Sequence, residues 1–390
     1  MRFWFRGSYD FGTGFKCKAK KVLRPKSWPR LRRCWTIGVV RAEPNSAQQS
    51  FESAAYFPAI PTLPNPTLSL LKTYLGFILA LSLECMQKPF ELTILGTSSA
   101  TPTRHRFPSS QYLRMDGEYF LIDCGEGTQM RLVQYNLRMQ KIKTILISHL
   151  HGDHFFGLPG LLTSMSLFGR SEPLTLVGPT PLETLLHHTL EASDSRLTFP
   201  LNFVATQDKE PATVLEGEGF RVSSFPLNHR IACTGFLFEE TGPELRLNVD
   251  ACHSLQVPVE AYASVKMGED YIRLDGTLIP NAALTLPGNK NRRYAYVSDT
   301  TQLPELAKFL HGVDLMYHEA TFMHDRLERA IQTYHTTSVQ AGEMAKWAEA
   351  KRLLLGHFSA RYSDLQPLLE EARSHFPNAE LAIEGMEITL

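Results

Sequence analysis

Apolar runs separated by glycine-containing turns begin at residue 90 and continue to the end of the chain. The runs at 90–97 and 119–127 are apolar, contain β-branched residues and end at glycines, a pattern typical of buried strands. Segments of the same kind predict further strands at 143–149, 174–179, 220–229, 234–240, 293–300, 314–321, 352–358 and 379–390. The pattern therefore predicts a sheet-rich protein from residue 90 onward.

Segments with helical spacing lie between several of these strands. They predict helices at 128–137, 157–169, 181–193, 303–313, 336–352 and 364–376. Because strands outnumber helices and alternate with some of them, we expect a layered α/β domain rather than a helical bundle.

The first 85 residues differ in composition from the rest. The first forty hold eleven Lys and Arg against one acid, Asp10, and a stretch rich in Pro, Ala and Ser follows at 42–67. The apolar segment 68–83 contains Lys72 and is shorter than the roughly 20 residues that a membrane span needs. We favour a poorly ordered leader or an over-extended start, with the folded domain at 86–390. A targeting or anchoring role and a folded addition stay open.

Charge and cysteine content narrow the cellular setting. The formal net charge is zero, so bulk charge indicates no polyanionic partner, although local patches can still bind one. The six cysteines are scattered and form no CxxC pair, which fits reduced thiols better than disulfides. We expect a cytoplasmic protein without a membrane partner.

Strong metal ligands are concentrated in SHLHGDHFFGLPG (148–160), directly after a predicted strand. His149 and His151 are two residues apart, so in an extended turn both side chains point to the same side. Asp153 and His154 are adjacent and diverge, which suits a second ion close by. Zinc takes such nitrogen and oxygen ligands and keeps a position open for water in catalytic sites.

Other polar residues stand at the ends of predicted strands, where loops collect at one edge of a sheet. They are His229, Asp299 and His357. Taken alone, His229 would be an ordinary core histidine, and Asp299 would be a turn residue. Their position at strand ends would bring all three to the sheet edge that carries the 148–160 segment.

The order of these motifs resembles the ribonuclease Z family of the metallo-β-lactamase superfamily. Segments 95–103, 120–132, 226–240, 296–301, 317–322, 334–337 and 353–362 match the family pattern in sequence order. The likeness covers nearly all of residues 90–390. It implies a metallo-β-lactamase αββα sandwich of the α/β class, with a small inserted arm and two metals at one sheet edge.

The resemblance also implies the cofactors and their ligands. We expect two Zn²⁺ per subunit, with Mn²⁺ or Fe²⁺ as alternatives. The implied ligands are five histidines and two aspartates: His149, His151 and His229 for one ion, Asp153, His154 and His357 for the other, and Asp299 between them.

Two adjacent divalent ions lower the pKa of a shared water and clamp an in-line displacement at phosphorus. We expect Asp153 to hold this water and accept its proton. Glu319 and His335 are outside the ligand set, and we expect them to stabilise the transition state and protonate the departing oxygen. An alternative for His335 is a neighbour of the helix cap at Thr336 or Thr337.

The activity implied by the resemblance is cleavage of precursor tRNA at its 3′ end, which removes the trailer and leaves a 3′-hydroxyl. A homodimer is implied by likeness only. Substrate phosphates need cations, and the candidates are Arg104, His105, Arg106, Arg131 and Arg361.

Residues 244–281 are the probable substrate-binding arm, with two short helical patterns and a hairpin that turns at an Asp-Gly pair. This stretch lacks the Gly-Pro pair common in family arms and has three basic residues, Arg246, Lys266 and Arg273. A phosphodiesterase of the same fold acting on small diesters therefore stays open, although it predicts a shorter arm or none. A metal-free scaffold of this fold is the non-enzymatic alternative, and the filled ligand positions disfavour it.

Overall fold

The computed structural model describes residues 88–242, 245–288 and 290–390. The leader expected at residues 1–85 lies outside these residues. In the described part, two seven-stranded sheets pack face to face. No described helix has the length and apolar character needed to cross a membrane.

The first sheet combines antiparallel and parallel pairing. Its strands are, in spatial order, β18 (Glu387–Thr389), β1 (Phe90–Gly96), β2 (Ser110–Met115), β3 (Glu118–Ile122), β4 (Thr144–Leu146), β5 (Leu174–Gly178) and β6 (Leu201–Ala205). Pairing is antiparallel from β18 to β3 and parallel from β3 to β6.

The second sheet has the same mixed character. Its strands are, in spatial order, β17 (Ala379–Leu381), β16 (Leu353–Gly356), β15 (Leu315–Glu319), β14 (Arg293–Val297), β9 (Cys233–Glu240), β8 (Phe220–Leu227) and β7 (Ala212–Glu216). Pairing is parallel from β17 to β14 and antiparallel from β14 to β7.

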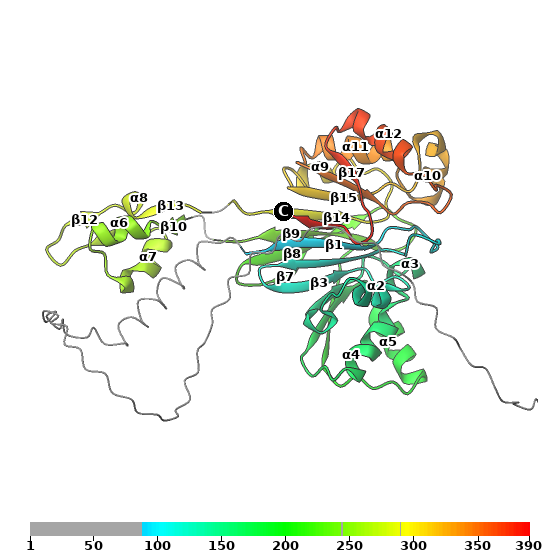
Figure 1. Ribbon diagram of the computed structural model, residues 1–390, viewed down its shortest axis with the longest axis horizontal. Helices are drawn as coiled ribbons and strands as arrows, with labels where there is room; N and C mark the ends of the chain where they lie inside the picture. Colours follow the sequence, from blue (N-terminus) through cyan, green and yellow to red (C-terminus); the bar gives the residue numbers. More distant parts are fainter. Residues whose placement is uncertain (1–87, 243–244, 289) are drawn as a thin grey trace, which may run out of the picture. The chain divides into compact units, whose positions relative to one another are not determined.

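Helices cover both outer faces of the sheet pair (Figure 1). The first sheet is covered by α2 (Thr128–Gln134), α4 (Leu158–Leu167) and α5 (Pro181–Ala192), and the second by α9 (Leu306–Phe309), α11 (Ser338–Trp347) and α12 (Gln366–His375). Aromatic side chains fill the space between the sheets, where the rings of Phe120 and Phe238 meet edge to face at 5.5 Å. The layers confirm the predicted αββα sandwich.

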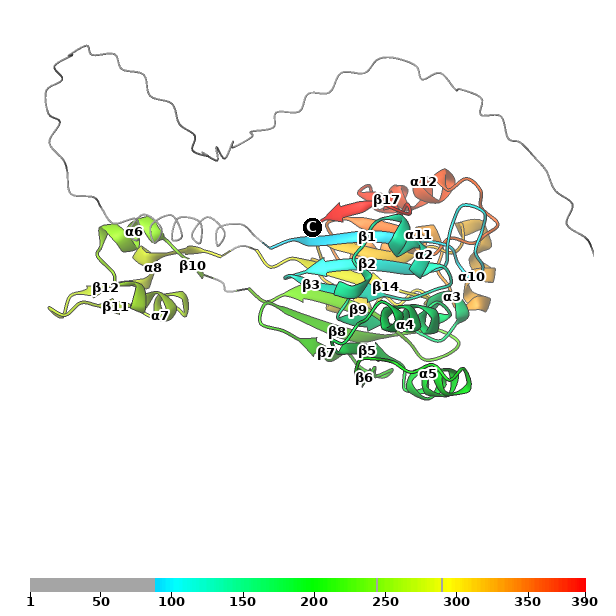
Figure 2. The same ribbon diagram turned by 60° about the horizontal axis from the view of Figure 1, so that its bottom comes forward.

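A separate small unit lies between β9 and β14 in the chain (Figure 2). It contains β10 (Leu245–Leu247), α6 (Val249–Ser254), α7 (Tyr262–Lys266), β11 (Tyr271–Ile272), β12 (Leu278–Ile279), α8 (Asn281–Leu284) and β13 (Thr285–Pro287). Cys252, Val265 and Leu284 are fully buried in a core of its own. The expected hairpin is the β11–β12 pair, and pairing of β10 with β13 carries the unit beyond residue 281.

The hydrophobic pattern of the sequence did not predict several of the observed strands correctly. Strand β2 was not predicted, because its buried residues include the polar Ser110 and Gln111 and it therefore lacks an apolar run. Strands β6 and β7 are sheet-edge strands whose residues are half-buried or exposed. The segment 379–390, predicted as one strand, divides into β17 and β18 in different sheets because the chain turns at Gly385, whose φ is +85°.

Candidate metal centre

The strands of both sheets deliver polar residues to one edge of the sandwich. His149 follows β4, and the next residues lead into the short helix α3 (Gly152–Phe155), which carries Asp153 and His154. The second sheet supplies the residues that follow β8, β14 and β16, namely His229, Asp299 and His357. All seven predicted ligands meet in two groups that share this edge.

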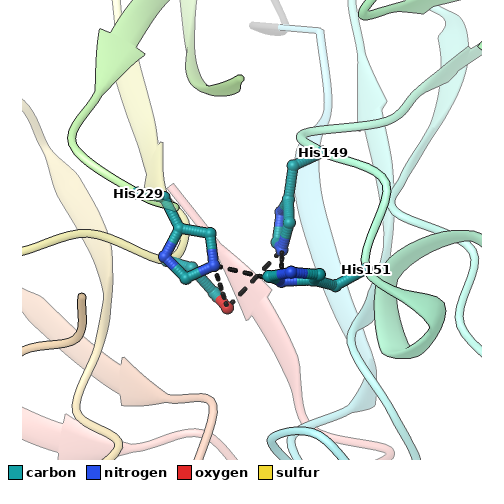
Figure 3. A group of neighbouring side chains, drawn as sticks. His149, His151 and His229 are labelled. Carbon is teal, nitrogen blue, oxygen red and sulfur yellow. Dashed lines mark hydrogen bonds and ion pairs between the residues drawn. The ribbon is translucent and has the colours of Figure 1, made fainter. Parts of the chain in front are cut away.

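The first group consists of three imidazoles and one carboxylate. His151 Nδ1 lies 3.1 Å from His149 Nε2 and 3.0 Å from His229 Nε2 (Figure 3). Asp299 Oδ2 is 3.6 Å from His149 Nε2 and 3.9 Å from His229 Nε2. These atoms lie within 4.8 Å of one another, which is the spacing of ligands around one ion.

The second group lies beside the first. His154 Nε2 and His357 Nε2 are 3.2 Å apart, and Asp153 Oδ2 lies 3.5 Å from the former and 3.4 Å from the latter. Asp299 Oδ1 is 3.4 Å from His154 Nε2 and 3.2 Å from His357 Nε2. One oxygen of Asp299 therefore faces each group.

The chemistry of these groups fits a divalent metal ion. In the first group, burial is the main factor that lowers the pKa of His149, His151 and His229, and neighbouring histidines lower it further, which favours the neutral, ligating imidazole. In the second group, burial lowers the pKa of His154, but the surrounding carboxylates outweigh it and raise this pKa, so His154 compensates their negative charge when no metal is bound. Asp299 Oδ1 is buried and has no hydrogen-bond partner among the described residues. Because a buried, unpaired carboxylate oxygen is costly, the cluster favours a cation at this position.

Four of the imidazoles are oriented by protein atoms on the side that faces away from the cluster. The Nδ1 atoms of His149, His154, His229 and His357 lie within hydrogen-bond distance of Ser148 Oγ (3.1 Å), Asp123 Oδ2 (2.8 Å), Tyr334 O (3.0 Å) and Thr321 Oγ1 (2.9 Å). Such contacts fix the ring orientation and the tautomer of metal ligands.

Asp123 connects the two sheets behind the cluster. Besides His154, its carboxylate accepts hydrogen bonds from Ser148 N (2.7 Å), Ser148 Oγ (2.9 Å) and the Tyr296 hydroxyl (2.6 Å). Asp123 and His357 both have left-handed backbone conformations, with φ of 55° and 56°. Such conformations are uncommon for residues other than glycine, although Asp and His adopt them more often than most residues do, and they recur at functional sites where the surrounding structure enforces them.

Glu319 and His335 form a pair next to the first group. His335 Nδ1 lies 2.9 Å from Glu319 Oε1 and 3.9 Å from Asp299 Oδ2. Burial lowers the pKa of His335, but the charge and hydrogen bond of Glu319 outweigh it and raise this pKa to about 9. Burial raises the pKa of Glu319, but His335 outweighs it and lowers this pKa to about 2. The pair therefore holds a proton on His335 at neutral pH.

Glu319 is fully buried and also accepts hydrogen bonds from Thr300 N (3.0 Å) and Thr321 Oγ1 (2.6 Å). Its carboxylate is thus engaged by protein donors, and His335 is one of its partners. The neighbouring His318 donates from Nδ1 to the Glu319 carbonyl at 2.7 Å, which agrees with a role in ordering the loop.

The basic residues that we expected to bind substrate phosphates differ in whether their side chains are free to contact a substrate. Arg131 is buried, forms an ion pair with Glu384 and donates a hydrogen bond to the Leu95 carbonyl. The expectation that Arg131 contacts substrate is therefore wrong. Arg106 donates hydrogen bonds to the carbonyls of Ser359 (3.1 Å) and Tyr362 (2.9 Å), so its guanidinium stabilises the fold. Arg104, His105 and Arg361 are exposed.

A pocket of about 430 Å³ opens over the cluster. Besides the metal-ligand candidates and His335, its walls include five residues to which the sequence analysis gave no role: Arg230, Arg329, Gln332, Thr333 and Tyr334. Four of them belong to α10 (Leu327–Thr333) and its C-terminal cap, an element absent from the predicted list. Arg230 could have been predicted from the sequence to lie near the site, because it directly follows His229.

Known proteins share this architecture. Human tRNase Z, short form, is 29% identical with a TM-score of 0.57, covering 76% of this chain and 98% of that structure. The metallo-beta-lactamase fold protein YhfI from Bacillus subtilis is 18% identical with a TM-score of 0.56, covering 78% and 100%. The fold and the histidine–aspartate cluster together define a metal-dependent hydrolase of the metallo-β-lactamase fold.

Sequence relatives narrow this class. Ribonuclease Z of Porphyromonas gingivalis is 44% identical over 301 residues, which are 77% of this chain and 99% of the relative. Ribonuclease Z of Parabacteroides distasonis is 40% identical over the same shares. A family model described as Anti-Pycsar protein Apyc1 matches residues 90–241, under half of the chain. The chain belongs to the ribonuclease Z family.

Proposed function

We propose that this protein is an endoribonuclease that cleaves precursor tRNA at its 3′ end, removes the trailer and leaves a 3′-hydroxyl. The observation that carries the proposal is the seven-ligand cluster beside the protonated His335–Glu319 pair. Membership in the ribonuclease Z family supports tRNA as the substrate.

We propose two Zn²⁺ per subunit, with Mn²⁺ or Fe²⁺ as alternatives. His149, His151 and His229 would hold one ion, Asp153, His154 and His357 the other, and Asp299 would bridge them. When bound, such ions activate water near neutral pH and offset the charge that develops on phosphate oxygens.

The side chains then have distinct tasks. The Ala100 amide donates to Asp153 Oδ2 at 2.6 Å and so fixes the carboxylate that we propose as the acceptor of the water proton. His335 carries the proton that neutralises the departing 3′-oxygen when the phosphorus–oxygen bond breaks. Glu319 orients His335 and keeps it protonated.

We further propose that the arm contacts the tRNA and that the protein acts as a cytoplasmic homodimer. Exposed apolar side chains on neighbouring elements support a self-association surface: Met130 and Val133 on α2, Phe156 after α3, and Leu167 and Phe168 at the end of α4. Gln129 on α2 donates to Ser164 on α4 at 2.6 Å, so these two helices are adjacent. Exposed apolar side chains gathered on adjacent helices are typical of a protein–protein contact.

Incubation of the protein with an end-labelled precursor tRNA carrying a 3′ trailer tests this function. We expect a cut near the discriminator nucleotide that disappears with chelator and in His151→Ala. His187→Ala is a matched control because His187 is an exposed histidine on α5. Hydrolysis of bis-p-nitrophenyl phosphate without any cut in the tRNA would refute the proposal in favour of a small-diester phosphodiesterase.

A further inference from the structure

Two arginines line the pocket over the metal centre and remain outside the proposed catalytic machinery. Arg230 lies in the loop after β8, and Arg329 lies on α10. Both are exposed, and neither forms an ion pair with an acidic residue in the described ranges. Arg230 Nη2 is 3.4 Å from His151 Nε2, so this cation stands directly beside the first ligand group.

Helix α10 turns one polar face toward the same pocket. Arg329, Gln332 and Thr333 are three and four residues apart, which places them on one side of a helix. The helix ends at Tyr334, whose φ of 59° turns the chain and whose carbonyl meets His229 Nδ1. Tyr334 is 39% exposed, and its ring stands edge to face with the His229 ring at 6.4 Å.

The charges in the pocket are divided between floor and mouth. The floor holds the buried carboxylates of Asp153 and Asp299, while the arginines stand at the mouth. A small diester has a single phosphate and needs only the floor. An RNA strand brings further phosphates, for which the planar guanidinium is a matching partner, and unpaired bases, which stack on exposed aromatic rings.

We propose that Arg230, Arg329 and Tyr334 form a nucleotide subsite beside the metal centre. The arginines bind the phosphate of the nucleotide adjacent to the cleaved linkage, and the Tyr334 ring stacks on its base. The subsite therefore selects a single-stranded RNA end over small diesters. This inference rests on the proposed function and names the part of the RNA that this pocket recognises.

Binding to the metal-free protein tests the arginines without the cleavage reaction. The probe is a fluorescein-labelled precursor tRNA with a 3′ trailer, titrated in chelator at several KCl concentrations with the full chain. We expect Arg329→Gln to raise Kd about five- to tenfold and to reduce the slope of log Kd against log salt by roughly one. Arg329→Lys keeps the charge and is expected to restore the slope.

Arg326→Gln is the matched control, because Arg326 precedes α10 by one residue, is exposed and does not line the pocket. We expect it to retain the wild-type salt slope. An unchanged slope in Arg329→Gln, or an equal loss in Arg326→Gln, would overturn the proposal in favour of diffuse surface charge.

The aromatic part is tested by comparing Tyr334→Ala with Tyr334→Phe. Stacking on a base predicts an increase in Kd of about fivefold or more for the alanine variant and retention of affinity for the phenylalanine variant. Equal affinities of the two variants would overturn the stacking role.

Cleavage assays separate the two proposals. If the wild-type protein cuts no precursor tRNA, the proposed function fails, while a binding loss confined to the Arg329 and Tyr334 variants still supports the subsite. If the wild type cuts, we expect Arg329→Gln to lower the ratio of tRNA cleavage to bis-p-nitrophenyl phosphate hydrolysis about fivefold or more. An unchanged ratio together with unchanged binding refutes the subsite.

Discussion

At the scale of single residues, the most specific feature is the division of protonation states among the histidines. Burial favours neutral His149, His151 and His229, whereas Glu319 favours a proton on His335. Ligation needs a free lone pair and general acid catalysis needs a proton, and the structure provides both within one pocket.

Glu319→Gln tests the proton on His335. The wild-type pKa of about 9 predicts that kcat for tRNA cleavage falls only above pH 9. In the variant the carboxylate that raises this pKa is gone and burial remains, so the pKa falls and the alkaline limb moves down by more than one pH unit. At pH 8 we expect kcat to fall at least about twofold, because less than half of His335 then keeps its proton.

A pH–rate profile checks this prediction, with Glu370→Gln on the exposed side of α12 as the control. An alkaline limb at the same pH in Glu319→Gln and wild type would show that Glu319 does not set the protonation of His335.

Asp299→Asn tests the bridging position. One oxygen of Asp299 faces each ligand group, so we expect the metal content measured by mass spectrometry to fall by half or more. Wild-type metal content in the variant would contradict the bridge, and Asp314→Asn, at a salt bridge with Lys351, is the control.

The residues of the site differ in how visible they are in the sequence. The metal-binding residues in 148–160 are close together in the sequence, so their spacing alone predicts a metal site. His229, Asp299 and His357 join the cluster through the order of the strands, and the resemblance supplied that order. Glu319 was expected to act on substrate, but its four protein hydrogen bonds follow from burial, which no sequence pattern reports.

At the scale of elements, the arm is the most independent part of the described chain. Its strands β10 and β13 pair with each other, and its apolar side chains form their own core. The hairpin was predictable because an Asp-Gly pair favours such a turn. Helix α10 was missed because Ala330 is the only buried residue among its seven, so the helix lacks the apolar periodicity of a packed helix, and the pocket residues on it were missed with it.

Replacement of residues 245–287 by a short Gly-Ser linker tests the arm. The sandwich core is separate, so we expect the variant to fold and to hydrolyse bis-p-nitrophenyl phosphate. Cleavage of precursor tRNA is expected to fall at least tenfold, because phosphate and shape contacts distant from the cut are lost. Circular dichroism and parallel assays of both substrates check this. Undiminished tRNA cleavage by a folded variant would show that the arm has no role in binding.

At the scale of the whole molecule, the proposed dimer depends on apolar side chains of α2 and α4. Met130 and Val133 are 67% and 63% exposed. We expect light scattering to give twice the chain mass of 44.1 kDa for the wild type and the single mass for a Met130→Glu/Val133→Glu variant. Ile383→Glu, at an exposed residue between β17 and β18, is the control. A monomeric wild type would refute the dimer.

The spread of the ligands along the chain has a consequence for protein synthesis. The cluster begins at His149 and is complete only with His357, which lies 33 residues before the last residue, Leu390. A polypeptide released early from the ribosome, anywhere before position 357, lacks one ligand even where its first sheet has formed. The complete cluster therefore requires synthesis through residue 357, and products terminated before that position carry an incomplete cluster.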